Sequence, residues 1–542
     1  MTHTALRRLG ALLGPAVVVA LGCGETSTSD DPGTGSGSAG TGTGTTGPGC
    51  GAVQLTDVAD GIGGFVLVGE TPSDRSAYEV SGAGDVNGDG LADVIVGAFY
   101  AGPDGLSQSG RAYVVFGKAN TEAISLADVA AGAGGFVLDG EPEGYAAGIS
   151  VSTVGDMNGD GLSDVVVGAS WASPNDVTGS GRAYVVFGKA DTGSVALADV
   201  ADGVGGFVLD GEVAGAQSGA TVSGAGDLNG DGIPEVIVWA RYADPNDLHA
   251  SGRTYVVFGK DTAPVLLADV AGGIGGFVLD GEAEYDYAGR NVGGAGDING
   301  DGLADLVVAA HFADPSDLRS AGRTYVVFGK ADTAPLLLAD VAGGVGGFVV
   351  DGEIRGEQSG FSASGAGDVN GDGIPDVLLG APGAAPNGSW RVGRGYVVFG
   401  KANTDPVQLA DVAQGVGGFA MDGENLRTVV GHAVSGAGDV NGDGLADVIV
   451  AGWRADTNGS QAGRTYVVFG KTDTDRVLLE DVTLRVGGFA LDGEGEHDQS
   501  GRSVSGPGDV NGDGLADILV GASGAAPGRA YVVFGGDFSC GE

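Results

Sequence analysis

The chain has 542 residues, a formal net charge of −45 from 71 acidic and 26 basic residues, and 110 glycines. The excess of acid excludes a nucleic-acid partner, because phosphate binding needs a basic face. Hydrophobic residues make up 42% of the chain, which excludes a disordered protein, and the glycines follow no three-residue period, which excludes collagen.

The N-terminus is typical of an export signal. Arg7 and Arg8 precede an apolar run at residues 9–22, which is too short and too interrupted by glycine to span a bilayer. The run ends in Val-Ala-Leu-Gly-Cys at 19–23. Small residues before a cysteine resemble a bacterial lipobox, with Ala20 where Leu or Val is usual. Residues 1–22 are therefore predicted to be a signal peptide, and Cys23 a lipid anchor in the bacterial outer membrane or cell surface. Simple secretion is the alternative.

Residues 24–49 consist almost entirely of Gly, Ser, Thr, Asp and Pro, a composition that cannot build a packed core. With Cys23 they form a predicted flexible tether at 23–49, which spans roughly 25–30 Å as a random coil. The tether would lift a folded domain, residues 50–542, off a membrane.

The folded domain consists of seven copies of one unit. Segments of the type Gly-Asp-Val-Asn-Gly-Asp-Gly-Leu-Ala-Asp place their first aspartate at 85, 156, 227, 297, 368, 439 and 509, so the spacing is always 70 or 71 residues. The segments Tyr-Val-Val-Phe-Gly and Gly-Gly-Phe recur with the same period. A fixed period of this size indicates a repeat architecture.

Each unit reads as four short strands bounded by Gly and Asp turns. In the second unit we expect strands at 149–154, 164–169, 182–187 and 206–209. Helical periodicity is nearly absent, although Ala-Asp-Val-Ala at 198–201 could form a single turn. The predicted fold is therefore all-β, a seven-bladed β-propeller of four-stranded antiparallel blades.

The order of the strands also predicts how the ring closes. The chain opens with a Gly-Gly-Phe strand at 63–69 and ends at 531–535 without one, so the N-terminal strand should complete the last blade. Cys50 and Cys540 flank these two strands and could form a disulfide across the closure in an oxidising compartment. Two free thiols are the alternative.

The recurring acidic segment predicts a calcium site. Asp-x-Asn-x-Asp-Gly-x-x-Asp places oxygen side chains at positions 1, 3, 5 and 9 of a tight loop, and a backbone carbonyl at position 7 adds a fifth ligand; Ca²⁺ prefers such oxygen donors. Glycine at position 6, Gly90 in the first copy, permits the sharp reversal. The predicted ligands are Asp85, Asn87, Asp89, Leu91 and Asp93; Asp156, Asn158, Asp160, Leu162 and Asp164; Asp227, Asn229, Asp231, Ile233 and Glu235; Asp297, Asn299, Asp301, Leu303 and Asp305; Asp368, Asn370, Asp372, Ile374 and Asp376; Asp439, Asn441, Asp443, Leu445 and Asp447; Asp509, Asn511, Asp513, Leu515 and Asp517.

Two alternatives to this site can be weighed. An EF-hand would need a bidentate Glu at position 12, where the first copy has Val96 inside an apolar strand. A plain hairpin turn would not explain seven complete copies in register. The sequence therefore predicts up to seven Ca²⁺ ions, which would separate carboxylates that otherwise repel one another.

The segment at 84–98, Gly-Asp-Val-Asn-Gly-Asp-Gly-Leu-Ala-Asp-Val-Ile-Val-Gly-Ala, resembles the FG-GAP repeat of integrin α-subunit propellers and their bacterial relatives. The resemblance covers roughly residues 51–540. It implies a recognition module whose calcium loops stabilise the blades on the face away from the ligand. Integrins carry calcium in only some blades, whereas all seven loops look competent here. Nothing like the integrin leg domains follows, so integrin-type signalling is not implied.

The other end of the blades is the predicted ligand face. Antiparallel order places the connections from strand two to three, and from strand four to the next strand one, opposite the calcium loops. Trp, Tyr and Arg are enriched at binding hot spots; packing of these aromatic residues between blades is the alternative. The connections from strand two to three carry Trp171, Trp239, Arg241, Tyr242, Phe312, Trp390, Arg391, Trp453 and Arg454. The connections from strand four to the next strand one carry Tyr145, Tyr285, Tyr287, Arg355, Arg427 and His432.

No catalytic constellation is recognisable. The five histidines share no motif, and neither Gly-x-Ser-x-Gly nor His-Glu-x-x-His occurs. We therefore expect a monomeric, non-enzymatic surface module for recognition or adhesion, with a protein or glycan ligand. A structural envelope protein is the alternative, and a polysaccharide-acting enzyme on a calcium propeller is the runner-up.

Overall fold

The computed structural model describes residues 51–538, apart from 142–143, 260–262, 389–390 and 425–427. The chain divides into two units, Met1–Pro48 and Gly49–Glu542, and every described residue belongs to the second. The predicted signal peptide, the tether, Cys23, Cys50, Cys540, Trp390 and Arg427 lie outside the described residues.

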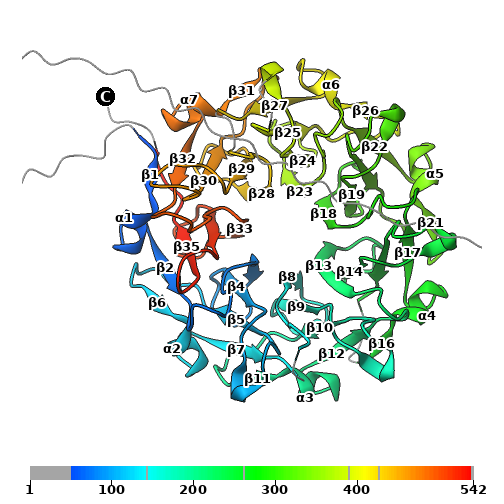
Figure 1. Cartoon of the computed structure of the whole chain (residues 1–542), viewed down its shortest axis with the longest axis vertical. Coiled ribbons are helices and arrows are strands. Elements are labelled where there is room, and N and C mark those ends of the chain that lie inside the picture. Colours follow the sequence, from blue (N-terminus) through cyan, green and yellow to red (C-terminus); the bar gives the residue numbers. More distant parts are fainter. Residues whose placement is uncertain (1–50, 142–143, 260–262, 389–390, 425–427, 539–542) are drawn as a thin grey trace, which may run out of the picture. The chain divides into compact units, whose positions relative to one another are not determined.

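The second unit is a ring of seven blades, and the colours of Figure 1 follow the chain once around it. Each blade contains four antiparallel strands, numbered here from the centre of the ring outward, and blades 1 to 7 are taken in chain order of their innermost strands. This confirms the predicted seven-bladed β-propeller. The first strands are β3 (Val80–Gly84), β8 (Ser150–Gly155), β13 (Ser218–Gly226), β18 (Asn291–Gly296), β23 (Ser362–Gly367), β28 (Ala433–Gly438) and β33 (Ser503–Gly508).

The second and third strands form the middle of every blade and are almost completely buried, because neighbouring blades cover both of their faces. Strands of this kind are continuous apolar runs rather than alternating ones. The second strands are β4 (Asp93–Ala98), β9 (Asp164–Ala169), β14 (Glu235–Ala240), β19 (Asp305–Ala310), β24 (Asp376–Ala381), β29 (Asp447–Gly452) and β34 (Asp517–Ala522). The third strands are β5 (Arg111–Val115), β10 (Arg182–Val186), β15 (Arg253–Val257), β20 (Arg323–Val327), β25 (Arg394–Val398), β30 (Arg464–Val468) and β35 (Arg529–Val533).

The outer part of each blade contains one strand more than the sequence predicts. A two-residue strand from the following unit pairs in parallel with the fourth strand, so all seven sheets have five strands. The fourth strands are β7 (Gly135–Asp139), β12 (Gly206–Asp210), β17 (Gly276–Asp280), β22 (Gly347–Asp351), β27 (Gly418–Asp422), β32 (Gly488–Asp492) and β2 (Gly64–Val68). The added strands of blades 1 to 7 are β11 (Val195–Ala196), β16 (Val265–Leu266), β21 (Leu336–Leu337), β26 (Val407–Gln408), β31 (Val477–Leu478), β1 (Val53–Gln54) and β6 (Ile124–Ser125).

Each added strand leads into one helical turn. In α3 the side chains of Leu197 and Val200, three residues apart on one face of the helix, are both buried. A helix this short is not stable by itself, so this packing holds it in place. The helices are α1 (Leu55–Ala59), α2 (Leu126–Ala130), α3 (Leu197–Ala201), α4 (Leu267–Ala271), α5 (Leu338–Ala342), α6 (Leu409–Val412) and α7 (Leu479–Thr483). Short 3₁₀ turns follow five second strands: η1 (Pro103–Gly105), η2 (Pro174–Asp176), η3 (Pro245–Asp247), η4 (Pro315–Asp317) and η5 (Pro386–Gly388).

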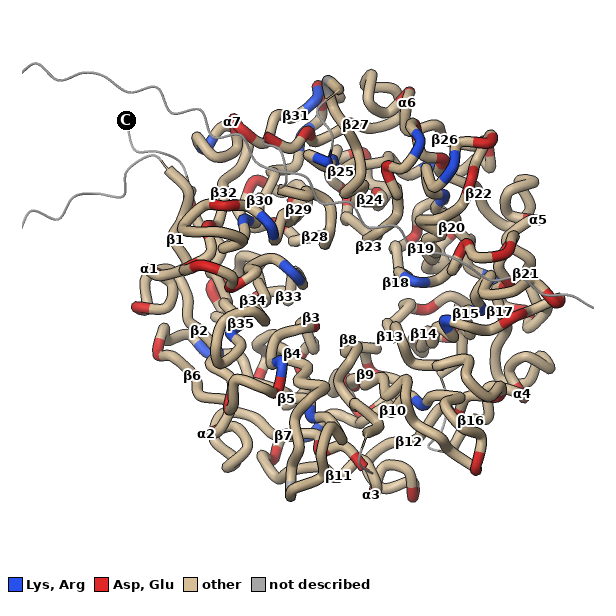
Figure 2. The backbone as a smooth tube through the Cα atoms, in the orientation of Figure 1, with Lys and Arg blue, Asp and Glu red and all other residues tan. Residues whose placement is uncertain are grey.

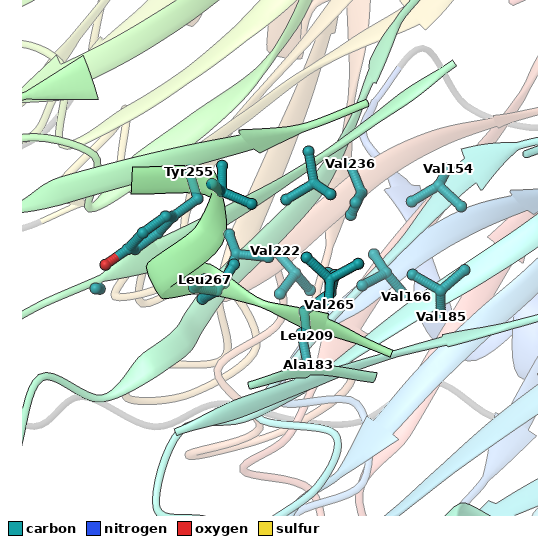
Figure 3. Packing of buried hydrophobic residues seen from close by; sticks show 14 of the residues in the cluster. Val154, Val166, Ala183, Val185, Leu209, Val222, Val236, Tyr255, Val265 and Leu267 are labelled. Carbon is teal, nitrogen blue, oxygen red and sulfur yellow. The ribbon is translucent and has the colours of Figure 1, made fainter. Parts of the chain in front are cut away.

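The hydrophobic core lies between blades. Figure 3 shows one layer of it, a cluster that contains Val166 and Val185 of blade 2 together with Val236 and Tyr255 of blade 3. These side chains are completely buried. Neighbouring blades therefore stabilise each other, which is why the fold needs a closed ring.

The N-terminal segment closes the ring as predicted. Strand β2 pairs antiparallel with β35 of blade 7, and β1 pairs in parallel with β32 of blade 6, so two strands join the ends of the chain (Figure 1). The Arg485 guanidinium donates hydrogen bonds to the carbonyl oxygens of Gly51 and Phe538 at 3.0 and 2.9 Å. One side chain thus holds the residue after Cys50 and the residue two before Cys540.

A repeated ion pair also joins each blade to the next. In blade 2, Arg182 Nε donates to Asp210 of the same blade at 2.6 Å, and its Nη1 donates at 2.9 Å to Glu141, which follows the fourth strand of blade 1. The Tyr184 hydroxyl donates to the same Glu141 oxygen at 2.7 Å. The Glu–Arg pairs that cross from blade to blade are Glu70–Arg111, Glu141–Arg182, Glu212–Arg253, Glu282–Arg323, Glu353–Arg394, Glu424–Arg464 and Glu494–Arg529.

Candidate functional site

The predicted calcium loops connect the first and second strands of all seven blades. The loop of blade 1 leaves β3 at Gly84 and enters β4 at Asp93, so position 9 is the first residue of the second strand. Gly90 at position 6 has a φ of 88°, a left-handed conformation that a side chain would strain. The loops therefore share one end of the ring.

Within each loop, carboxylate and amide oxygens already accept hydrogen bonds from the loop backbone. In blade 1, Asp85 Oδ1 accepts from Gly88 N at 2.7 Å, and Asp85 Oδ2 accepts from Gly90 N at 2.9 Å. Asn87 Oδ1 accepts from Asp89 N at 2.8 Å. These bonds turn the backbone around its first aspartate and bring positions 1, 3 and 5 together.

The carboxyl group at position 9 is enclosed by protein. Asp93 is fully buried, and its two oxygens accept from Val86 N and Gly117 N, both at 2.8 Å. Burial raises the pKa of Asp93 to about 7, although these two hydrogen bonds lower it. The nearby Asp89 and Asp85 carboxylates also raise it. Burial likewise raises the pKa of Asp164 to about 7 and that of Glu235 to about 8.

In the third loop the carboxylates converge. Asp227, Asp231 and Glu235 each place an oxygen within 4.8 Å of the others. Among the described residues, no other three His, Cys, Asp or Glu side chains lie this close together. Glu235 is one methylene longer than the aspartate in the other six loops, so its carboxylate reaches further toward the loop.

The donor set of the loops fits Ca²⁺. Each loop offers three carboxylates, one amide oxygen and the position-7 carbonyl, all oxygens. A cation among them would offset the burial that raises the position-9 pKa. The residues that would hold it are those at positions 1, 3, 5, 7 and 9 of each loop.

The loops also hold neighbouring blades together. The Asp85 carbonyl oxygen of blade 1 accepts from Ser163 N in the loop of blade 2 at 2.8 Å, and the Asp509 carbonyl of blade 7 accepts from Ala92 N of blade 1 at 2.9 Å. In blades 3 and 5 the donor position is occupied by Pro234 and Pro375, which have no N–H. Five of the seven junctions between neighbouring loops therefore carry this backbone hydrogen bond.

The opposite end of the ring carries a set of residues that differ from blade to blade. Each lies just before, or within the first residues of, the first strand of its blade, and the spacing is again 70 or 71 residues. Together they surround the opening of the central channel. We call them the mouth ring: Tyr78, Ile149, Ala220, Arg290, Phe361, His432 and Arg502. They line a cavity of about 410 Å³, together with Trp171, Arg241 and Glu79.

Aromatic side chains continue around this opening. Phe361 lies between His311 and His432, with ring centroids 5.5 and 4.9 Å away, and His432 lies 5.6 Å from Trp453. On the other side Tyr78 packs against Phe99 at 4.8 Å. Arg502 joins the two groups, because its guanidinium lies 4.6 Å from the Tyr78 ring and 5.6 Å from the Trp453 ring.

Cationic groups gather at the same opening in an acidic protein, and Figure 2 shows Lys or Arg positions beside the centre of the ring next to β18 and β33. Arg290 lies 3.9 Å from the Phe361 ring. Burial lowers the pKa of Arg290 to about 10, as does Arg241 nearby. Burial also lowers the pKa values of His311 and His432 to about 3, so both imidazoles are neutral at physiological pH.

A second cavity, of about 550 Å³, adjoins the mouth. Phe361 and His432 line both cavities, so these two side chains form the wall between them. Arg319, Arg355 and Arg454 lie on the far side of that wall, with Trp453. The two cavities together make a surface of arginines and aromatic rings.

The nine predicted ligand-face residues have different positions. Trp171 is 38% exposed, and Tyr242 and Phe312 are each 39% exposed. Trp239 departs from the expected surface position: it is 2% exposed, and its Nε1 donates to the Ala288 carbonyl at 2.7 Å. It packs between blades, where the corresponding residues are Gly or Ala. Trp390 lies outside the described residues; Arg241, Arg391 and Arg454 are exposed, and Trp453 is half-buried.

Most of the mouth ring was not predicted from the sequence. Tyr78, Arg290, Phe361 and Arg502 were not predicted, because each precedes an ordinary strand and belongs to no motif. The signal that could have found them is their equivalent position in successive repeats, where side chains change completely between near-identical segments. Within the described residues, no helix has the length and apolar character needed to cross a membrane.

Comparison with known proteins gives one family of repeats. A model described as FG-GAP repeat matches residues 77–115, 147–186, 288–327, 360–398 and 500–533, which belong to blades 1, 2, 4, 5 and 7. The chain is 32% identical over 250 residues to integrin alpha pat-2 of Caenorhabditis elegans, which covers 45% of this chain and 18% of that protein.

Two further relatives match shorter segments. Integrin alpha-4 of Xenopus laevis is 29% identical over 166 residues, 30% of this chain and 14% of its own length. Phosphatidylinositol-glycan-specific phospholipase D of Bos taurus is 29% identical over 175 residues, 31% of this chain and 19% of its own length. The chain therefore spans less than a fifth of each of these relatives.

Proposed function

We propose that this chain, an FG-GAP repeat β-propeller of the integrin-α-like type, is a calcium-binding recognition or adhesion module whose ligand, a protein or a glycan, binds at the mouth ring. One observation carries the proposal. Seven near-identical acidic loops lie at one end of the ring, whereas the seven mouth-ring positions at the other end hold six different residue types. In repeat proteins, variation confined to one face is typical of a binding surface.

The calcium loops have a structural role in this proposal. Their backbones contact one another around the ring, and their position-9 carboxyls are buried. Ca²⁺ in up to seven loops would stabilise the blades without contacting the ligand. The name of the integrin relatives supports recognition as the function of the propeller, and the proposal assigns the chain no catalytic activity.

The proposed location is the cell surface. The apolar run at 9–22, Cys23 and the Gly/Ser/Thr-rich segment support export, lipid anchoring and a flexible tether that presents a monomeric propeller to the outside. Cys50 and Cys540 would pair as a disulfide there, and Arg485, which holds Gly51 and Phe538, supports their proximity.

The test is a ligand screen with the full chain in calcium, on a glycan array, an array of extracellular proteins and whole cells. We expect binding to at least one class, and weaker binding for Trp171→Ala than for Val204→Ala, which removes an exposed apolar residue away from the mouth. If no class binds and deletion of the gene changes only envelope integrity, the chain is a structural envelope protein and the proposal fails.

A polysaccharide-acting enzyme is the second candidate, favoured by Glu79. Burial raises the pKa of this mouth carboxyl to about 7, partly offset by Arg502, which suits a general acid or base. The relative named as a phospholipase D is a further reason to measure activity. Release of reducing ends or unsaturated products from a bound glycan, lost in Glu79→Gln, would favour this candidate.

A further inference from the structure

We infer that the mouth ring binds an acidic sugar residue: a short oligosaccharide that carries a carboxylate or sulfate group, which the arginines contact while aromatic rings pack against the sugar. This inference rests on the proposed function and specifies its ligand. It is carried by the positions of four arginines, by unpartnered polar atoms in the cavity walls and by the aromatic lining.

The arginines of the two cavities that carry the inference, Arg241, Arg290, Arg454 and Arg502, form no ion pair with a described carboxylate, although Arg502 is close enough to Glu79 to lower its pKa. The arginine that begins each third strand forms an ion pair, such as Arg182 with Asp210 and Glu141. By contrast, no ion pair within 4.0 Å joins Arg241, Arg290, Arg454 or Arg502 to an acidic side chain of the described residues. In a chain with a net charge of −45, four such cations at one opening are available to an external anion.

Several polar atoms of the cavity walls also have no partner. Arg290 Nη1 is buried without a hydrogen bond within the described residues, and so are His432 Nδ1 and Trp453 Nε1. Arg290 lines the first cavity, Trp453 the second, and His432 both. Buried polar atoms are normally hydrogen-bonded, and a ligand in these cavities would supply the three missing bonds. Sugar hydroxyls can both donate and accept such bonds.

The remaining lining favours a sugar over an acidic peptide. The Phe361, His432 and Trp453 rings follow one another around the opening at 4.9 and 5.6 Å, a surface on which the C–H face of a pyranose can pack. The cavities of about 410 and 550 Å³ share the Phe361–His432 wall, so adjacent sugar residues could occupy both sides of it. Among the described residues that line the two cavities, Glu79 is the one with a carboxyl group. A charged Glu79 would repel the anion unless it pairs with Arg502, and a protonated Glu79 would not repel it.

Calorimetric titration of the calcium-loaded full chain with trigalacturonate, its methyl ester and a sulfated chondroitin disaccharide tests the inference. We expect one of the anionic sugars to bind, and the uncharged ester to bind at least about tenfold more weakly than trigalacturonate if the group is a carboxylate. Binding of only the sulfated sugar assigns the group as sulfate and supports the inference equally. An ester that binds as tightly as the acid would overturn it.

Variants locate the site. Arg290→Met and Arg502→Met should each weaken binding about tenfold or more, whereas Lys189→Met, which removes one positive charge near the calcium-loop end, should leave it unchanged. If Arg290→Met does not fold, Arg290→Lys, which retains the charge, takes its place in the comparison with Lys189→Met. Equal binding of Arg290→Met and Lys189→Met, or binding of hexaglutamate as tight as that of the sugars, contradicts the inference.

The two proposals fail in different ways. If the array screen finds a neutral glycan or a protein as the ligand and no anionic sugar binds, the acidic-sugar inference is wrong and the recognition module stands. If nothing binds in either experiment, both proposals fail.

Discussion

The carboxyl group at position 9 closes each calcium loop, and it is almost completely enclosed by protein. In blade 2, Asp164 Oδ1 and Oδ2 accept hydrogen bonds from Gly188 N and Met157 N at 2.9 Å each. Both donors belong to neighbouring segments of the same blade, so this carboxyl joins the loop, the second strand and the third-to-fourth connection. Its protonation and its metal therefore act on the stability of the blade.

Replacement of this carboxyl should remove one calcium site. We expect the melting temperature of Asp164→Asn to rise less on calcium addition than that of the parent, beyond any loss in chelator from the two backbone hydrogen bonds to this carboxyl. Loss of one bound ion costs about 2.7 kcal/mol at a hundredfold excess over its Kd. Glu235→Asp is the matched control, since it gives loop 3 the residue of the other six. An equal rise on calcium addition in Asp164→Asn and the parent would mean that this carboxyl holds no metal.

His311 should make the protein less stable in acid. Its folded pKa is about 3, lowered by burial and then by Arg290 and Arg241, whereas an unfolded histidine titrates near 6.5. Between these values the unfolded chain binds the proton and the folded chain does not, so stability is lost as the pH falls through 6.5. At pH 5 the loss is about 2 kcal/mol.

The measurement is the melting temperature in saturating calcium at pH 7 and pH 5. His311→Phe should lose less stability between these two values than the parent, and His497→Phe, at an exposed position, should behave as the parent does. If His311→Phe loses as much as the parent, the histidine is not held neutral by its surroundings.

At the scale of the structural element, blades are joined by charged side chains as well as by apolar ones. Glu141 follows the fourth strand of blade 1 and contacts Arg182 and Tyr184 on the third strand of blade 2, with both members of the ion pair largely shielded from solvent. Hydrogen bonds between charged groups at such sites are stronger than those on the surface. A Glu–Arg pair crosses each of the seven junctions, and together these pairs make a belt around the ring.

Removal of one charge from this belt should lower stability measurably. We expect Glu141→Gln to cost about 1–2 kcal/mol of unfolding free energy, from denaturant titration, because the bonds from Arg182 and Tyr184 lose their charged acceptor. Asp191→Asn is the control: it breaks the Lys189 pair at a site where Asp191 is 77% exposed, so no change is expected. Equal effects of the two variants would show that the belt contributes no more than a surface pair.

The sequence predicted the four antiparallel strands of each blade because short segments with apolar residues recur between Gly and Asp turns. It did not predict the added parallel strands, since two residues such as Val195 and Ala196 carry no periodicity. The belt was also missed, because Glu141 and Arg182 lie 41 residues apart and meet only when two blades stack. Trp239 was grouped with surface aromatics, although it fills a space between blades that Gly or Ala leaves elsewhere.

At the scale of the whole molecule, a closed ring depends on the segment that joins its ends. Strand β2 occupies the place in blade 7 that β7 occupies in blade 1, and Phe65 of β2 is as fully buried as Phe136 of β7. A ring closed in this way should be as stable at the junction as within a blade.

Matched substitutions of phenylalanine by alanine in β2 and β7 test this closure. Phe65→Ala and Phe136→Ala should each cost about 3–5 kcal/mol of unfolding free energy, since both remove a buried phenylalanine from a fourth strand. The comparison is made by denaturant titration in calcium. A cost for Phe65→Ala far below that for Phe136→Ala would mean that the N-terminal strand is loosely attached and that the ring opens at blade 7.

The central claim is that bound calcium stabilises one end of the propeller, which leaves the unlike residues at the other end free to recognise a ligand. The most direct test is the calcium content of the full chain, measured by elemental analysis after chelation and reloading, together with its melting temperature in calcium and in chelator. We predict up to seven ions per chain and a clear fall in melting temperature when they are removed. A chain that binds no calcium, or that melts at the same temperature without it, would contradict the account.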